Sequence, residues 1–251
     1  MSGLAKNSAA ATSRHSNLML RSVLESCHRW KLNRTLKGIP ATGTVVGHAT
    51  FISPPSSDIS SATSSADIAS PSVSFVEAQT SLQLLRFEED GELHLPANGV
   101  KLPIQQAYYF GVNDSSFVAC TPKDDNDNDD GLHPKWKMWF PDGRDFLDLR
   151  FEPLTVSPEG LFRSEAFSLL KFDDSELATG AWLAAVDRHL CGDDTYDAHF
   201  CIRCVPAAAA DGEGASAAPP LMCVHEMRYS FSVFGPHKEY VAVTQLLRDT
   251  A

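Results

Sequence analysis

The stretch His189-Leu190-Cys191-Gly192-Asp193-Asp194-Thr195-Tyr196 predicts a tight β-hairpin. Gly192-Asp193 suits a two-residue turn, because glycine readily adopts the positive φ that type I′ and type II′ turns require. With this turn, His189 lies opposite Tyr196 and Cys191 lies opposite Asp194 on two antiparallel strands. One short hairpin therefore brings an imidazole, a thiol, a carboxylate and a phenol together.

The face that carries these four side chains is otherwise apolar. It continues as Leu183 and Ala185 on the first strand, and as Ala198, Phe200 and Ile202 on the second. Side chains alternate between the two faces of a strand, and the apolar face packs inward. We therefore expect the four polar groups to point into the interior of a β-structure, close to its end.

Most of the chain outside this hairpin also has the alternation of a strand, as Gly43–Ile52 shows clearly. Spacing of Leu18, Leu20, Val23 and Leu24 predicts a short N-terminal helix at about 17–27. The expected fold is an all-β, antiparallel barrel of about ten strands with this helix against one opening. The predicted strands cover 29–37, 43–52, 82–95, 101–112, 116–120 with 135–140, 144–151, 182–191, 194–205, 221–234 and 238–248.

The domain organisation follows from composition. Residues 1–16 are expected to be disordered, and 17–251 to form a single β-barrel domain. Segments rich in Ser, Ala, Pro, Gly or Asp interrupt it at about 53–80, 121–134, 152–180 and 206–220. Without them roughly 150 residues remain, which is a usual size for one barrel.

Composition also excludes some function classes. The 251 residues are 43% hydrophobic and 21% charged, as in an ordinary globular protein. A net charge of −11 argues against a nucleic-acid surface, although five aspartates between 124 and 130 supply −5 of it. No apolar stretch approaches the roughly 20 residues of a membrane helix. We expect no nucleic-acid partner and no membrane partner.

The N-terminal region has no secretory signal, so we expect an intracellular, cytoplasmic protein. Its first 24 residues carry Lys6, Arg14 and Arg21 and no acid, which leaves a mitochondrial presequence as an alternative. The six cysteines are accordingly expected to be reduced. Cys201-x-x-Cys204 lies in a predicted strand, where its odd spacing sends the two thiols to opposite faces.

Two further turns carry polar residues. They are Pro141-Asp142-Gly143-Arg144-Asp145-Phe146 and Phe234-Gly235-Pro236-His237-Lys238-Glu239-Tyr240. Connections of an up-and-down sheet alternate between its two ends, and two strands separate each of these turns from the 192–193 turn. All three tight turns should therefore lie at one end, with the long insertions at the other.

Three classes of function remain open for this end. The leading hypothesis is a binding site in the barrel mouth for a small, partly apolar, anionic molecule. Arg144 and Lys238 would meet its negative group. The polar atoms would be oriented by His189, Asp194, Tyr196 and Tyr240, with Cys191 on the same face and Phe200, Phe231 and Trp182 as apolar walls.

The alternatives use the same residues differently. In an enzyme, His189 would be the general acid or base, positioned by Tyr196 or Asp194. Two weaker variants are a metal site of His189, Cys191 and Asp194 and a thiol nucleophile at Cys191. The nucleophile is disfavoured because the negative charge of Asp194 opposes formation of the thiolate. The third class is an interaction scaffold whose long loops dock a partner. The chain has no Gly-x-Ser-x-Gly, P-loop or dinucleotide motif, and no cofactor is identified.

These motifs, in this order, resemble an uncharacterised domain-of-unknown-function family of lipocalin-like (calycin-type) β-barrels. The resemblance implies a fold and a set of marked residues rather than a reaction. The chain departs from the family at Leu147, where a His is usual, and at Tyr229 and Phe231, where a Trp is favoured. The matching pieces are Trp30–Arg34, Gly47–Phe51, Glu88-x-x-Gly91-x-Leu93, Tyr108–Phe110, Phe140–Phe146, His189–Tyr196 and Gly235-Pro236-x-Lys238-x-Tyr240.

Overall fold

Antiparallel strands account for most of the chain that can be described. The computed structural model describes residues 29–39, 42–53, 75, 84–112, 135–153, 170, 172, 181–206, 222–236 and 238–249. The strands are β1 (Trp30–Ile39), β2 (Gly43–Ile52), β3 (Leu84–Leu95), β4 (Val100–Val112), β5 (Lys135–Trp139), β6 (Asp145–Arg150), β7 (Glu152–Pro153), β8 (Ala181–Cys191), β9 (Asp194–Pro206), β10 (Met222–Phe234) and β11 (Glu239–Arg248).

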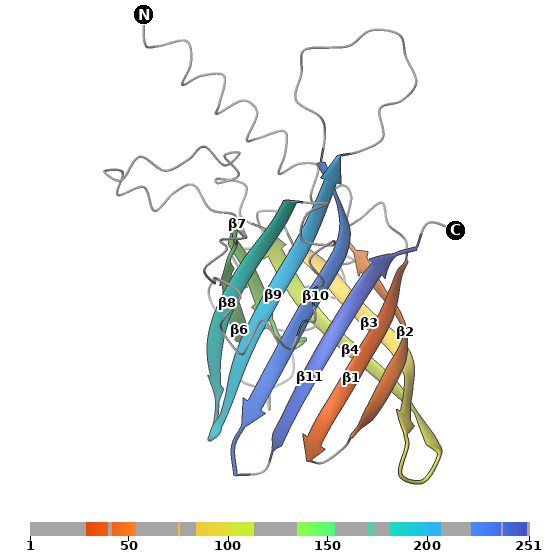
Figure 1. Cartoon of the computed structure of the whole chain (residues 1–251). Helices are drawn as coiled ribbons and strands as arrows, with labels where there is room; N and C mark the ends of the chain where they lie inside the picture. Colours follow the sequence, from red (N-terminus) through yellow and green to blue (C-terminus); the bar gives the residue numbers. More distant parts are fainter. Residues whose placement is uncertain are drawn as a thin grey trace, which may run out of the picture.

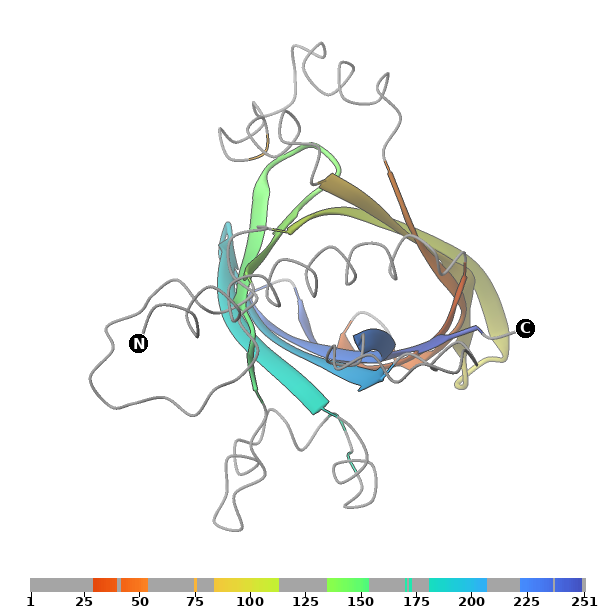
Figure 2. The same cartoon turned by 90° about the horizontal axis from the view of Figure 1, so that it is seen from above.

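All eleven strands belong to one sheet, in the order β6-β5-β4-β3-β2-β1-β11-β10-β9-β8-β7. Each strand therefore pairs with its neighbours in sequence, except that β6 and β7 do not pair with each other, and β1 also pairs with β11. Only Phe151 separates β6 from the short β7, so these two segments together form one strand position of the barrel wall. The wall therefore has ten strand positions. Viewed from above, the sheet curls into a nearly closed ring (Figure 2). The predicted antiparallel barrel of about ten strands is confirmed.

The barrel is joined differently where the ring closes. β7 pairs with β8 through Glu152 opposite Ala184, whereas β6 packs beside β8 without a ladder of backbone pairs. The backbone N–H of Asp148 on β6 instead donates to the Asp187 side chain on β8, with a distance of 2.6 Å to Oδ2. A side chain thus replaces part of the missing ladder at this seam.

Strand boundaries agree with the sequence prediction to within a few residues. The exception within the described chain is β7, which lies at the start of the segment expected to be irregular. The predicted helix at 17–27, the N-terminal 16 residues and the strand at 116–120 lie outside the described residues. Among those described, none forms a helix long and apolar enough to cross a membrane.

The two ends of the barrel differ as strand counting predicted. The strand ends joined by the short connections β1–β2, β3–β4, β8–β9 and β10–β11 gather at the lower end in Figure 1. The strand ends next to the longer undescribed segments, between residues 53 and 84, 112 and 135, 153 and 181, and 206 and 222, lie at the upper end. We call the lower end the tight-turn end.

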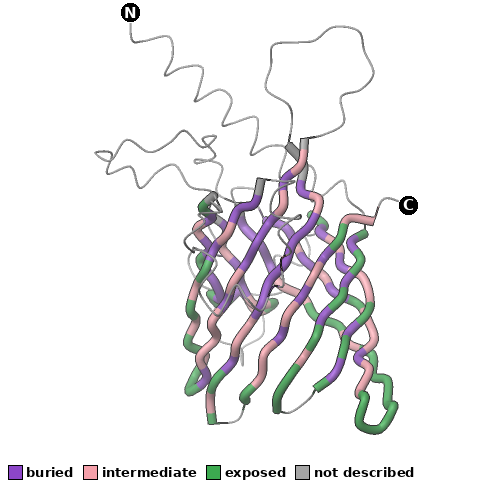
Figure 3. The backbone as a smooth tube through the Cα atoms, in the orientation of Figure 1, coloured by how far each residue is buried: buried purple, intermediate pink, exposed green. Residues whose placement is uncertain are grey.

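Burial changes along the barrel axis. Aromatic side chains fill the half away from the tight turns, where Phe51 contacts Trp30, Phe87 and Phe110 with ring centroids 4.7–6.1 Å apart. Toward the tight-turn end the strands become exposed (Figure 3). Along β11, for example, Thr244 and Ala242 are buried and Tyr240 is only partly covered. The interior is therefore packed at one end and open at the other.

A second, smaller cluster lies on the outer face and corrects one expectation. Trp182 packs there with Leu170 and Cys201, whereas Cys204 belongs to the inner core. Trp182 is thus no wall of the interior, because its position in β8 alternates with the inward-facing Leu183 and Ala185. The same alternation confirms that Cys201 and Cys204 face opposite sides.

Candidate functional site

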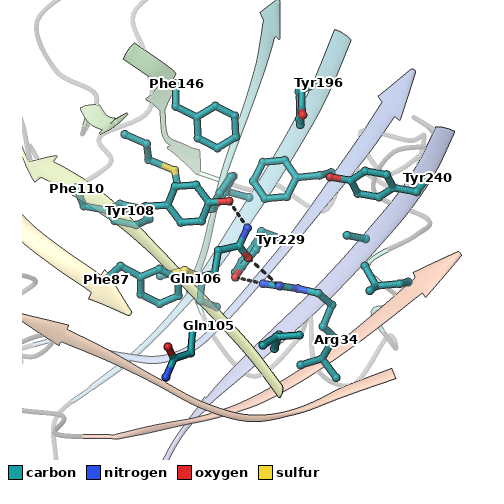
Figure 4. A pocket seen from close by; sticks show the side chains of 18 residues that line it. Arg34, Phe87, Gln105, Gln106, Tyr108, Phe110, Phe146, Tyr196, Tyr229 and Tyr240 are labelled. Atoms are coloured by element: carbon teal, nitrogen blue, oxygen red, sulfur yellow. Dashed lines mark hydrogen bonds between the residues drawn. The ribbon is translucent and has the colours of Figure 1, made fainter. Parts of the chain in front are cut away.

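A cavity of about 380 Å³ occupies the half of the lumen nearer the tight turns. Its walls are mainly apolar, and include Leu36, Val45, Ile104, Phe200 and Phe231. Its polar groups are few: Arg34, two glutamines and four tyrosines (Figure 4). Phe200 and Phe231, which the sequence predicted as apolar walls, are both lining residues. A concave, mostly apolar space with a small number of polar groups is typical of a small-molecule site.

The floor of this cavity is a buried ion pair. Arg34 Nη2 lies 2.6 and 2.7 Å from the two carboxylate oxygens of Glu89, and both side chains are almost fully buried. Arg34 Nε also donates to Thr244 Oγ1 at 2.7 Å. Tyr229 accepts a hydrogen bond from Arg34 Nη2 and donates one to Glu89. Every charge at the floor is therefore compensated by a hydrogen-bonded partner, as burial requires.

The ionisation states at the floor are fixed by this arrangement. Burial lowers the pKa of Arg34, but the nearby Tyr229 and Glu89 oxygens outweigh it and raise the pKa well above the ordinary value. Burial raises the pKa of Tyr229, and the negative charge of Glu89 raises it further. Arg34 is thus a permanent cation and Tyr229 a neutral phenol, so neither supplies a titrating group near neutral pH.

A line of hydrogen bonds leads from the floor into the cavity. Arg34 Nη1 donates to Gln106 Oε1 at 3.1 Å, and Gln106 Nε2 donates to the Tyr108 hydroxyl at 2.6 Å. Burial, and then the charge of Glu89, raise the pKa of Tyr108. Phe146 stacks on the Tyr108 ring with centroids 5.5 Å apart. Glu89 of the floor lies directly opposite Gln106 of this polar wall, on the adjacent strands β3 and β4.

The hairpin that the sequence singled out has the predicted register. His189 lies opposite Tyr196, and Cys191 lies opposite Asp194. Tyr196 and Tyr240 line the cavity, as predicted for the motif end. Lys238 Nζ lies 3.1 Å from the Tyr196 hydroxyl and 3.4 Å from Asp194 Oδ2. The 189–196 hairpin and the 234–240 turn therefore meet at the rim of the cavity.

A glycine shapes this rim. A Cβ atom added at Gly235 would lie 1.8 Å from Asp194 Oδ1, so only glycine leaves room for the carboxylate. The Oδ1 atom is buried and has no hydrogen-bond partner within the described chain, whereas Oδ2 faces Lys238. Gly-Pro-x-Lys is thus a seat for Asp194 as well as a turn.

Other predicted site residues lie off the cavity. The Arg144 guanidinium is held by Asp142 of its own turn, with Nε 2.8 Å from Oδ2, and lies over the Phe140 ring. His189 contacts the rings of Phe140 and Phe146 and does not line the cavity. Burial lowers the pKa of His189. Cys191 is a half-buried free thiol and is also not a lining residue.

The structure adds residues that sequence reasoning missed: Arg34, Glu89, Gln106, Tyr108 and Tyr229. A usable signal was present in two of the strands. Arg34 has the same parity as Trp30 and Leu32 in β1, and Glu89 the same parity as Leu85 and Phe87 in β3. A charged residue on an apolar strand face must be paired inside the protein. Gln106 also has the parity of the apolar Ile104 and Phe110 in β4, but a neutral amide needs no buried counter-charge and gives a weaker signal.

No metal centre is found among the residues that the structure describes. No three His, Cys, Asp or Glu side chains there are arranged to hold a metal ion, and this includes His189, Cys191 and Asp194.

One of three comparisons with known proteins found a match. No curated protein and no solved structure matches the chain. A family model does match, and it spans residues 27–248, which include every described strand, the buried floor and the three turn motifs. The chain therefore belongs to the Family of unknown function (DUF6314).

Proposed function

We propose that this protein binds one small, partly apolar molecule in the lumen cavity. The observation that carries the proposal is the cavity itself, about 380 Å³ with apolar walls and a fixed set of polar groups. This volume lies within the range of about 300–1,000 Å³ that is usual for ligand pockets. The lipocalin-like architecture suggested by the motifs belongs to the same proposal, since barrels of that kind hold one small ligand in the lumen.

The charged groups around the cavity indicate where a negative group of the ligand would lie. Arg34 is neutralised by Glu89, and Arg144 is paired with Asp142 and drops out as a ligand contact. Lys238 is exposed at the rim, and its ammonium lies between Tyr196 and Asp194. The apolar body of the ligand would thus lie in the lumen, and any negative group would lie at the rim beside Lys238.

The enzyme alternative has less support. It assigns acid–base chemistry to His189, which lies against Phe140 and Phe146 outside the cavity lining. The scaffold alternative relies on long segments outside the described residues. Neither explains why the lumen carries a polar wall.

A lumen-filling variant tests the binding proposal. Ala242 is a buried lining residue on β11, and Ala242→Trp places an indole in the cavity. The probe is anilinonaphthalene sulfonate, which is apolar with one anionic group, and the signal is its fluorescence. Wild type should bind it saturably, and Ala242→Trp should not. Val186→Trp, on the exposed outer face of β8, is the matched control and should bind as wild type does.

Folding is checked by circular dichroism, and Ala242→Leu is a milder second variant. If both Ala242 variants fold and bind the probe with wild-type affinity, the lumen is not the binding site. Native mass spectrometry of the purified protein supplies an independent readout, because a retained ligand adds its mass to the folded species.

A further inference from the structure

The amide of Gln106 has only one orientation that satisfies its neighbours. Arg34 Nη1 lies 3.1 Å from one end of the amide, and a guanidinium can only donate hydrogen bonds. That end must therefore be the oxygen. The other end, 2.6 Å from the Tyr108 hydroxyl, is then the NH2 group, which also only donates. Arg34 thus decides which way Gln106 faces.

The direction of these bonds fixes the role of the Tyr108 hydroxyl. Its oxygen accepts from Gln106, so its own hydrogen is left to donate. Burial and the charge of Glu89 raise the pKa of Tyr108, which keeps that hydrogen in place near neutral pH. Within the described chain Tyr108 has no acceptor for it, and the residue lines the cavity.

Tyr196 is arranged in the same way from another strand. The Lys238 ammonium donates to its hydroxyl at 3.1 Å, and an ammonium has no acceptor capacity. The hydrogen bond to Tyr196 and the charge of Asp194 raise the pKa of Lys238, so it remains a donor. The Tyr196 hydroxyl therefore also accepts from the protein and has its hydrogen left over.

The Tyr108 and Tyr196 side chains lie close to each other in the wall of the cavity. Phe146 contacts both rings, with centroids 5.5 Å from Tyr108 and 6.0 Å from Tyr196. In Figure 4, Tyr108 and Tyr240 reach into the cavity from opposite sides with their oxygens foremost, and Tyr196 lies above them. Tyr229 is different, because its hydroxyl both accepts from Arg34 and donates to Glu89 and is fully used at the floor.

We propose that the ligand presents a hydrogen-bond acceptor, a carbonyl or carboxylate oxygen, to the hydroxyl groups of Tyr108 and Tyr196. This inference rests on the proposed binding in the lumen and adds the chemistry of the ligand's polar end. A ligand whose polar group can only donate finds two donors facing it and is rejected, because buried donors without acceptors are costly.

Matched ligands separate the inference from the binding proposal. Acetylnaphthalene, ethylnaphthalene and protonated naphthylethylamine have nearly the same shape, but offer an acceptor, no polar group and a donor respectively. Affinities are measured by calorimetric titration. The ketone should bind wild type about tenfold more tightly than the hydrocarbon, and the amine should bind most weakly. Naphthoate tests whether the site prefers a charged acceptor. Its affinity should exceed that of the ketone only if the site favours an anionic carboxylate over a neutral carbonyl.

Variants test the named hydroxyls. Tyr108→Phe and Tyr196→Phe should each lower the affinity for the ketone about fivefold and leave the affinity for the hydrocarbon unchanged. Tyr109→Phe, in the separate cluster with Phe75 and Trp139, is the matched control and should change neither. Gln106→Glu is the sharpest test, since a carboxylate there accepts from both Arg34 and Tyr108 and turns the Tyr108 hydrogen away from the cavity. Gln106→Glu should lower the affinity for the ketone as much as Tyr108→Phe does, although the Tyr108 side chain is still present.

Each outcome decides one level. If none of the four ligands binds, both the lumen proposal and this inference fail. If ketone and hydrocarbon bind equally, or the amine binds best, the lumen binds ligands but the acceptor inference is wrong. It is also wrong if Gln106→Glu keeps the full preference for the ketone.

Discussion

Arg34 and Glu89 form their ion pair across an intervening strand, with Nη2 2.6 Å from Oε1. Arg34 lies on β1 beside Val45 of β2, and Glu89 lies on β3 beside Ala49 of β2. On the interior face of β2 the only residue between Val45 and Ala49 is Gly47. The two charged side chains therefore meet over a glycine, where no side chain separates them.

Removing one member of this pair should be costly. Glu89→Ala leaves the Arg34 guanidinium buried without its carboxylate, and we expect the free energy of unfolding to fall by about 3–5 kcal/mol. Urea denaturation followed by fluorescence measures this. Asp197→Ala removes the partner of the exposed Arg188 and should cost less than about 1 kcal/mol. Equal losses in the two variants would show that the Arg34–Glu89 pair is not a structural element of the core.

The glycine beneath the pair should not accept a side chain. A Cβ atom at Gly47 would lie 2.2 Å from the backbone oxygen of Asp90 and 2.5 Å from Cα of Gly91. Gly47→Ala should therefore force β2 and β3 apart and cost about 1–3 kcal/mol of unfolding free energy. Thr44→Ala, exposed on the same strand, should stay within about 0.5 kcal/mol of wild type. A Gly47→Ala protein as stable as that control would contradict the close approach.

His189 should make stability depend on pH. Burial lowers its pKa below the ordinary 6.5, and Arg144 adds to this while Asp187 and Asp145 oppose it. The unfolded chain therefore binds the proton at a higher pH than the native protein does. This contribution is fully present above the unfolded pKa, and is lost as the pH falls from there toward the folded value.

The measurement is the unfolding free energy at several pH values between about 8 and about 5. His189→Gln should flatten the loss on acidification relative to wild type, because the variant has no imidazole to charge. Leu190→Gln, at the exposed neighbouring position of the hairpin, removes no titrating group and should keep the wild-type slope. A His189→Gln curve parallel to wild type would refute the assignment.

The seam between β6 and β8 should be the weakest part of the wall. Asp187→Ala removes the acceptor of the Asp148 amide, which has a 2.6 Å bond to Oδ2. The Asp148 amide should then exchange with solvent faster, as followed by deuterium exchange and NMR, while global stability falls by only about 1 kcal/mol. Asp197→Ala, on the neighbouring β9, should leave Asp148 unchanged. Unaltered exchange in Asp187→Ala would mean that other contacts hold the seam.

The sequence predicted the barrel well, because alternation along a strand and tight-turn residues are local signals. The register of His189 with Tyr196 followed from the two-residue turn at Gly192-Asp193. Of the residues that the sequence singled out, Tyr196, Tyr240, Phe200 and Phe231 line the cavity. Arg144 was predicted to contact the ligand. In the structure its guanidinium pairs with the acid at position 142 within the turn, and no strand pattern reveals such a side-chain rotamer.

The buried floor could not be assembled from sequence. It joins Arg34 to residues 55, 195 and 210 positions away. Parity marks Arg34 and Glu89 as inward-facing charges, yet only the curvature of the sheet decides that they meet. The orientation of Gln106 depends in turn on Arg34, so the polarity of the cavity is a property of the closed barrel.

The pairing of β1 with β11 has a consequence for how the protein is made. Arg34 emerges from the ribosome early, but Thr244 and Tyr229 are among the last described residues to be synthesised. Until then the β1 edge has no β11 to cover it, and the Arg34 cation has only part of its shell. Closure of the barrel is therefore expected to come late and to be slow, as is usual for folds dominated by distant contacts. A nascent chain that stalls before β11 exposes an unpaired strand edge, which is a hazard for aggregation.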